Sequence, residues 1–337
     1  MTEVVLLSVV VVAACALLTA GLIVLLKPTL NRHFLAIPNE RSSHGQPVPQ
    51  GAGIAMMAAM LAVYVALWLL DHLQVDPPWP LPVLGAAVWL TMLGALDDAA
   101  DLPILWRLAG QAAAAIVIVF NLPEGFQILP EVLPVTVERS LLVIGIIAFI
   151  NAVNFLDGID WITVAQTVPM AAAVIVMAFM GAVPDNVGLI ALLLLGATLG
   201  FAVFNKHPAR IFLGDAGSLP VGLLLAWMLI FVARADVEAA LILPLYTLAD
   251  TGVTLIRRAR QGEPLWVAHR SHFYQRAVML GFKAPDVTLR VFLLGCLLAA
   301  LSIAAVEVES FAIDLALLAF GAGATAFLLR HLERGRA

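Results

Sequence analysis

The sequence predicts an all-α, polytopic membrane protein with about eleven transmembrane helices. Of the 337 residues, 62% are hydrophobic and only 12% are charged. The mean hydropathy is strongly positive, at +1.01, and this profile differs from that of ordinary soluble domains. The chain also divides into apolar stretches of roughly 17 to 25 residues, the length that crosses a bilayer as a helix. We expect residues 1–337 to form a single integral-membrane domain.

Eleven apolar stretches have the length of a membrane span. They are centred near residues 4–26, 52–70, 80–96, 104–120, 140–156, 162–183, 188–204, 218–234, 239–258, 289–306 and 312–330. The first begins MTEVV, with no basic region, and has no small-residue cleavage site before Lys27. We therefore interpret it as a retained anchor and not as a signal peptide.

Basic residues predict which end of the bundle faces the cytoplasm, because Lys and Arg accumulate in short cytoplasmic loops. With eleven spans and an external N-terminus, only Arg139 and Arg234 fall on the external side, and the other 16 of the 18 Lys and Arg residues fall opposite. The two cysteines, Cys15 and Cys296, lie inside predicted spans. They therefore predict neither a disulfide framework nor a metal site.

The predicted cytoplasmic loops carry nearly all of the reactive side chains. They contain five polar segments, which are PNERSSHGQPVPQGAG at 38–53, LDDAADLP at 96–103, NAVNFLDGIDW at 151–161, FNKHPARIFLGDAGS at 204–218 and RRARQGEPLWVAHRSHFYQR at 257–276. Since all five face one compartment, a helical bundle can bring them together into one cytoplasm-facing site.

Taken singly, each acidic group in these segments has an ordinary structural explanation. Asp97 and Asp98 end the third span, where adjacent acids often form a solvated helix end. Asp157 and Asp160 are three residues apart and would share a face if the helix continued, and loop hydrogen bonding is the alternative. Asp215 directly precedes a long apolar helix, where Asp is a common N-terminal cap.

Taken together, the polar segments indicate chemistry on phosphates. Carboxylate and amide oxygens suit Mg²⁺, which commonly shares its ligands with substrate phosphates. Basic side chains that can receive phosphate oxygens are Arg41, His44, His269, Arg270 and His272. This set favours phosphoryl-group transfer to a membrane-embedded acceptor. A transporter is the rival hypothesis from another class, but it would place ionisable groups near the bilayer midplane.

In their order and membrane placement, the five segments resemble the polyprenyl-phosphate N-acetylhexosamine-1-phosphate transferases. This group is glycosyltransferase family 4, which includes the phospho-N-acetylmuramoyl-pentapeptide translocase and the enzymes that initiate O-antigen and related glycans. The resemblance implies a multi-pass enzyme of the bacterial inner membrane with its active site on the cytoplasmic side. In the implied reaction, undecaprenyl phosphate attacks the sugar-linked phosphorus of a UDP-N-acetylhexosamine, releasing UMP and leaving a polyprenyl-diphosphate sugar.

The resemblance also implies roles for residues of this chain. Asp215 matches the principal Mg²⁺ ligand, with Asn154 beside it and Mn²⁺ as an alternative ion. Asp97 and Asp98 match the acidic pair of acceptor activation, and Asp157 joins them as the third catalytic residue. The positions matching the nucleotide, sugar and diphosphate environment are Asn154, Asp160, Asn205, Phe212, His269, Arg270 and His272.

Two departures from the family pattern bear on the substrate. Where the family often has a lysine after the paired acids, this chain has Asp101, so a phosphate contact there must come from elsewhere, for example from Arg107. The last segment reads HRSHFYQR in place of consecutive histidines, which favours the glycan-initiating branch over the pentapeptide translocase.

For the mechanism, we prefer direct displacement to a covalent aspartyl-phosphate intermediate. We expect membrane lipid and no nucleic acid as partners, and the hexosamine and a homodimer stay open.

Overall fold

The computed structural model describes residues 2–36, 46–70, 80–265, 267, 269–308 and 310–335. Within these ranges the regular structure is helical except for one short antiparallel pair of strands. The elements are α1 (Thr2–His33), β1 (Leu35–Ala36), β2 (Val48–Pro49), α2 (Ala52–Leu69), α3 (Pro80–Ala100), α4 (Ile104–Phe120), α5 (Val135–Phe155), α6 (Ile162–Phe179), α7 (Asp185–Asn205), α8 (Asp215–Ala235), α9 (Val237–Ile242), α10 (Leu245–Arg260), α11 (Phe273–Met279), α12 (Ala284–Val308) and α13 (Phe311–Glu333). The predicted all-α class is confirmed.

The membrane-spanning character of the helices is also confirmed. Among the described residues, nine helices are long and apolar enough to cross a membrane, namely α1, α2, α3, α5, α6, α7, α8, α12 and α13. Helix α4 is apolar but shorter, with 17 residues. Ten of the eleven predicted spans therefore correspond to single helices.

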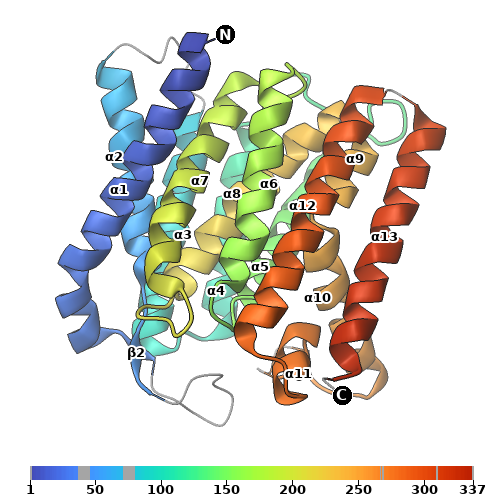
Figure 1. Cartoon of the computed structure of the whole chain (residues 1–337). Helices are drawn as coiled ribbons and strands as arrows, with labels where there is room; N and C mark the ends of the chain where they lie inside the picture. Colours follow the sequence, from blue (N-terminus) through green and yellow to red (C-terminus); the bar gives the residue numbers. More distant parts are fainter. Residues whose placement is uncertain are drawn as a thin grey trace.

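The ninth predicted span, 239–258, is not one continuous helix, so this prediction was wrong. The chain there forms α9 and α10, which are separated at Leu243 and Pro244. Proline has no backbone N–H and cannot continue a helical ladder, so the break falls at this residue. Helix α10 also buries a polar face that includes Tyr246, Asp250 and Thr254. Figure 1 shows α9 and α10 following one another from one end of the bundle to the other.

Successive long helices run alternately up and down the bundle (Figure 1). The N-terminus lies at one end and the C-terminus at the other, as an odd number of crossings requires. Helix α11 and the β1–β2 pair lie at the end that holds the C-terminus. The polar loops predicted to share a compartment are therefore gathered at one end.

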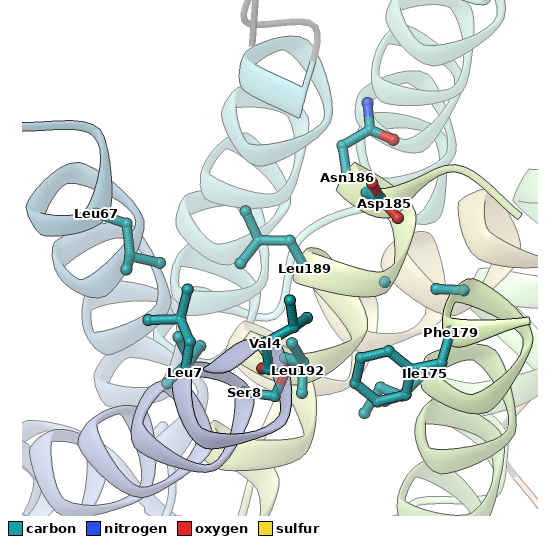
Figure 2. A pocket seen from close by; sticks show the side chains of 13 residues that line it. Val4, Leu7, Ser8, Leu67, Ile175, Phe179, Asp185, Asn186, Leu189 and Leu192 are labelled. Carbon is teal, nitrogen blue, oxygen red and sulfur yellow. Dashed lines mark hydrogen bonds between the residues drawn. The ribbon is translucent and has the colours of Figure 1, made fainter. Parts of the chain in front are cut away.

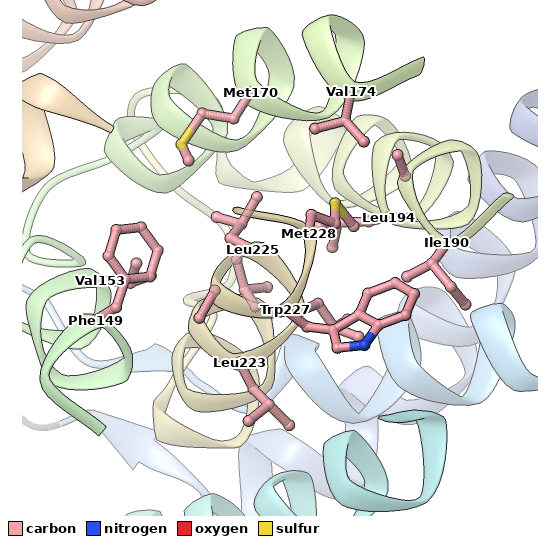
Figure 3. Packing of buried hydrophobic residues seen from close by; sticks show 14 of the residues in the cluster. Phe149, Val153, Met170, Val174, Ile190, Leu194, Leu223, Leu225, Trp227 and Met228 are labelled. Carbon is pink, nitrogen blue, oxygen red and sulfur yellow. The ribbon is translucent and has the colours of Figure 1, made fainter. Parts of the chain in front are cut away.

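Helix α8 is the central helix, and 89% of its most apolar 18-residue stretch is buried. Figure 3 shows Leu223, Leu225 and Met228 of α8 packed among side chains of α5, α6 and α7. Lipid tails are as apolar as these side chains, so tight packing and not water exclusion holds helices together inside a bilayer. A central, fully packed α8 gives its first residue, Asp215, a fixed position.

Two glycines let neighbouring helices approach the start of α8 closely. A Cβ atom added to Gly53 of α2 would lie 2.1 Å from the Cα atom of Gly217, and one added to Gly94 of α3 would lie 2.2 Å from the carbonyl oxygen of Asp215. Real Cβ atoms do not come this close to backbone atoms. The absence of side chains at Gly53 and Gly94 therefore sets how α2 and α3 meet α8.

Candidate active site

Four carboxylates meet at the end of the bundle that holds the polar loops. Asp97 and Asp98 lie in the last turn of α3, Asp157 lies between α5 and α6, and Asp215 is the first residue of α8. They come from three separate polar segments of the sequence. The structure therefore brings together the acidic groups that the sequence analysis singled out.

Asp98 is bonded to the N-terminus of α8. Its two carboxylate oxygens accept hydrogen bonds from the backbone N–H groups of Asp215 and Ala216, each at 3.1 Å. Such N–H groups have no partner inside the helix, and a carboxylate stabilises the positive end of the helix dipole. The capping role that sequence rules offered to Asp215 is thus performed by Asp98, and the N-cap residue itself is Gly214.

Arg107 of α4 connects two of the acids. Its guanidinium group lies 3.0 Å from a carboxylate oxygen of Asp97 and 3.5 Å from one of Asp215. The other oxygen of Asp97 accepts the backbone N–H of Leu102 at 2.8 Å. Arg107 reaches these two acids from the next helix, and its positive charge offsets part of the acidic cluster.

Asn154, in the last turn of α5, also contacts Asp215. Its amide nitrogen donates to a carboxylate oxygen of Asp215 and to the hydroxyl of Ser218, both at 2.8 Å. Because the nitrogen makes both bonds, the amide oxygen is the atom that can bind a cation. Asp157 accepts a hydrogen bond from Thr163. Burial, together with repulsion from Asp98, raises the pKa of Asp157 to about 6 against the opposing effect of Thr163.

A cavity of about 260 Å³ lies against this cluster. Its wall contains Asp98, Asn154, Asp157 and Asp215. Further side chains that line it are Gln50, Ile159, Asn205, Phe212 and Gln275. All five polar segments therefore reach or adjoin one cavity.

Asp157 and Asp160 do not share a helical face, because α5 ends at Phe155, and of the two possibilities left open by the sequence, loop hydrogen bonding is the one found. Asp160 instead lies 2.7 Å from the Nδ1 atom of His207 and accepts the backbone N–H of Ala209 at 3.1 Å. It lines a neighbouring cavity of about 280 Å³, and Ile159 and Phe212 line both cavities.

Asn205 stabilises the wall between these cavities. Its side chain accepts the backbone N–H of Trp161 at 2.7 Å and donates to the carbonyl oxygen of Ile211 at 3.0 Å. It thereby ties the loop after α5 to the loop before α8. Asn205 and Phe212, which the family resemblance associates with one ligand, do lie along the same cavity.

The last polar segment contains two differently placed histidines, and of this segment Gln275, not the histidines, lines the cavity of the acidic cluster. His272 is 2% exposed, and its Nδ1 atom lies 3.0 Å from the carboxylate of Asp250. His269 is less buried and stacks on His272 with ring centroids 4.9 Å apart. Burial, with the nearby His272 and Arg258, lowers the pKa of His269 to about 4, so its ring is neutral at pH 7. Arg270 is half-buried between the two histidines.

Basic residues at the end of α10 have partners inside the protein. Arg258 is 6% exposed and bonds to the carbonyl oxygen of Pro264 at 2.8 Å and to Glu263 at 2.6 Å. Arg257 pairs with Glu333 of α13. Both residues are therefore paired with groups of the protein itself.

Arg41 and His44, predicted to bind phosphate, lie outside the described residues. Several site residues were not singled out from the sequence, namely Gln50, Ser218, Asp250, Tyr274 and Gln275. The signal for Asp250 was present, since a lone carboxylate inside an apolar stretch is itself unusual. The glutamines gave no signal, because isolated amides are common in loops.

The donors at the cavity suit a hard cation. In the described part of the chain, no group of three or more His, Cys, Asp or Glu side chains could hold a metal ion alone. Two oxygen donors, the Asp215 carboxylate and the Asn154 amide, adjoin the cavity. Mg²⁺ typically binds through one or two protein groups and completes its shell with water and substrate phosphates. The residues therefore fit a shared Mg²⁺ and not a closed protein cage.

Figure 2 shows another cavity, of about 340 Å³, near the end of the bundle that holds the N-terminus. Its walls are mainly apolar and come from α1, α2, α6 and α7, with Leu7, Leu67, Phe179 and Leu192 among them. The acidic cluster lies at the opposite end. This cavity therefore plays no part in the candidate active site.

Fold and site together define an integral-membrane protein with an acidic cavity at one end of an apolar bundle. A model of the family described as glycosyl transferase family 4 matches residues 80–233. The chain is 30% identical over 294 residues to the decaprenyl-phosphate N-acetylglucosaminephosphotransferase of Mycobacterium leprae, covering 77% of this chain and 73% of that protein. The chain therefore belongs to glycosyl transferase family 4.

Two further relatives represent different branches of this family. The probable undecaprenyl-phosphate N-acetylglucosaminyl 1-phosphate transferase of Bacillus subtilis is 27% identical, over 83% of this chain and 78% of its own length. The phospho-N-acetylmuramoyl-pentapeptide-transferase of Mycolicibacterium smegmatis is 26% identical, over 83% of this chain and 92% of its own length. Membership of the family that the sequence resembled is confirmed.

Proposed function

We propose that the protein transfers N-acetylhexosamine 1-phosphate from a UDP-sugar to undecaprenyl phosphate at the cytoplasmic face of a bacterial inner membrane. The observation that carries the proposal is the meeting of Asp97, Asp98, Asp157 and Asp215 beside one cavity at the end of an apolar bundle. A soluble nucleotide can reach this position from water, and a lipid phosphate can reach it from the bilayer.

In the proposed reaction, an oxygen of the polyprenyl phosphate forms a bond to the sugar-linked phosphorus, and the bond from that phosphorus to the oxygen of UMP breaks. The products are polyprenyl-diphosphate sugar and UMP. Both reactants are anions, so positive charge must offset their repulsion. Arg107 supplies one such charge between Asp97 and Asp215. A Mg²⁺ ion held by Asp215 and Asn154 would neutralise charge on the diphosphate.

Direct displacement fits the described contacts better than a covalent intermediate does. A phosphate monoester has a second pKa near 6 and is mostly dianionic at neutral pH, so it needs little help from a base. Both oxygens of Asp98 are bonded to the N-terminus of α8, which leaves this residue poorly placed to attack phosphorus. We assign Asp98 to positioning Asp215 and Asp97 to orienting Arg107.

The two adjoining cavities suggest how the donor is divided. Phe212 lines both, and an aromatic face can stack on a nucleobase. We place the uracil in the cavity with Asp160 and His207, and the diphosphate in the cavity with Asp215. Asn205 holds the wall between them.

N-acetylglucosamine is the sugar to test first, because the Bacillus subtilis and Mycobacterium leprae relatives carry it in their names. The product would then start an O-antigen or a related cell-envelope glycan. The pentapeptide transferase reaction is the second candidate, which the Mycolicibacterium smegmatis relative favours and the HRSHFYQR segment disfavours.

The proposal is tested by incubating purified protein with undecaprenyl phosphate, Mg²⁺ and a panel of UDP-N-acetylhexosamines and measuring UMP release. UDP-N-acetylmuramoyl-pentapeptide belongs in the same panel. We expect UMP with at least one simple hexosamine donor and none without the lipid phosphate. Release of UMP from the pentapeptide donor alone would move the protein to the other branch, and release from no donor would contradict the proposal.

A further inference from the structure

Asp250 is a fully buried carboxylate outside the acidic cluster. It lies on α10, and its side chain is 0% exposed. Burying an ionised carboxylate is costly unless hydrogen bonds replace its water. A group retained at such a cost must have strong partners, and these partners show what Asp250 does.

The partners of Asp250 come mainly from the last polar segment. One carboxylate oxygen lies 3.0 Å from the Nδ1 atom of His272 and accepts the backbone N–H of Phe273 at 3.1 Å. The other accepts the hydroxyl of Tyr246 at 3.1 Å and the backbone N–H of Tyr274 at 3.4 Å. Three consecutive residues of the segment are thus bound to one side chain of α10.

The segment held by Asp250 is fixed to the active site at its other end. The hydroxyl of Tyr274 donates to the carbonyl oxygen of Phe155 at 3.0 Å, directly before the loop that carries Asp157. A Cβ atom added to Gly158 would lie 2.1 Å from this hydroxyl, so the two elements are in close contact. Gln275, the next residue, lines the cavity of the acidic cluster.

Hydrogen bonds also determine which ring nitrogen carries the proton on each histidine. An ionised carboxylate only accepts hydrogen bonds, so the Nδ1 atom of His272 must carry a proton. His269 stacks on His272, and its own Nδ1 atom accepts the backbone N–H of Ser271 at 3.2 Å. The proton of the neutral His269 ring therefore lies on Nε2, which can donate to a phosphate oxygen.

We propose that Asp250 is a positioning residue of the transferase, which acts through His272 to hold the 269–275 segment, with His269 and Gln275, at the active-site cavity. The inference rests on the proposed function for its kinetic consequence. A purely structural Asp250 would stabilise the fold without a selective effect on turnover. A positioning Asp250 affects turnover more than it affects donor binding.

The test compares Asp250→Asn with a matched buried carboxylate at the other end of the bundle. Glu138 of α5 is 4% exposed and accepts the backbone N–H groups of Ile128 and Leu129, both at 2.9 Å. Glu138→Gln is therefore the structural control. We expect Asp250→Asn to lower kcat about 10- to 100-fold, as loss of an orienting partner typically does, with KM for the donor unchanged. Glu138→Gln should keep the wild-type kcat.

A double variant separates positioning from a general loss of stability. Because Asp250 and His272 hold the same segment together, adding Asp250→Asn to His272→Ala should lower kcat by less than the product of the two single losses. Hydrogen exchange of the 269–275 backbone gives a second readout that needs no activity, and it should accelerate in Asp250→Asn and not in Glu138→Gln. If Asp250→Asn does not fold, Tyr246→Phe removes one hydroxyl donor from the same carboxylate and should change kcat and exchange in the same direction.

Three results would overturn the inference: wild-type kcat and exchange in Asp250→Asn, equal losses of kcat in Asp250→Asn and Glu138→Gln, or losses from Asp250→Asn and His272→Ala that multiply. Failure of the proposed function is distinguishable, because the wild-type protein would then release no UMP. In that case the exchange of residues 269–275 would still decide whether Asp250 holds the segment.

Discussion

Replacement of Gly94 by alanine tests whether the close contact between α3 and α8 sets the position of Asp215. A Cβ atom at residue 94 would lie 2.2 Å from the carbonyl oxygen of Asp215 and 2.3 Å from its carbonyl carbon. Relief to an ordinary van der Waals contact of 3.4 Å or more requires a shift of at least about 1 Å between backbones packed at interior density. A misplacement of about 1 Å can lower the rate about 100-fold, and overpacking costs about 1 to 3 kcal/mol of stability.

The assay is UMP release at saturating donor and lipid acceptor, with thermal unfolding measured in the same detergent. Gly85→Ala is the matched control, because residue 85 lies on the same helix and an added Cβ would meet no atom within 4 Å. Alanine is favoured over glycine in a helix, so Gly85→Ala should be fully active and equally or more stable. Wild-type kcat in a folded Gly94→Ala variant would refute the view that this contact positions Asp215.

Three further predictions concern the last loop, Asp157 and the topology. His269→Ala should lower kcat and kcat/KM together, because a neutral donor to the diphosphate is lost, and wild-type values would move the loop from catalysis to a structural role. Folding favours protonated Asp157 because its pKa is raised to about 6, so in EDTA the stability of the wild type should increase by about 1 kcal/mol as pH falls from 7.5 to 5, measured as a higher thermal midpoint. Asp157→Asn should make this rise smaller, and an identical pH dependence in both proteins would contradict the prediction. A cysteine placed at Arg260, after replacement of Cys15 and Cys296, should be protected from an impermeant external reagent in intact cells, and labelling there would reverse the assigned sidedness.

The spans and the class of protein were predictable because a bilayer imposes one length and one composition on the helices that cross it. The break in the ninth span was harder to predict. Pro244 was visible, but its effect depends on α10 burying Asp250 and Tyr246 in a polar contact with a loop more than twenty residues away. The length of an apolar stretch does not show whether its polar residues will have such a partner, so it could not predict the break.

The acidic groups of the site were predictable from their grouping in predicted cytoplasmic loops, but their individual contacts were not. Sequence rules gave the capping role to Asp215, whereas Asp98 performs it from another helix. Nothing in the basic run at 257–260 indicated that Arg258 would be buried against Pro264. Both contacts arise from tertiary packing, which overrides local sequence preference.

The proposed metal chemistry is tested most directly by measuring UMP release in wild-type protein and in Asp215→Asn, each over a series of Mg²⁺ concentrations and in EDTA. The substitution keeps the size of the side chain and removes its charge. We expect turnover of the wild type to require Mg²⁺ and to stop in EDTA, and Asp215→Asn to fold but lose nearly all turnover at every Mg²⁺ concentration. Full activity of Asp215→Asn, or undiminished wild-type activity in EDTA, would remove Asp215 from a metal site and contradict the proposed chemistry.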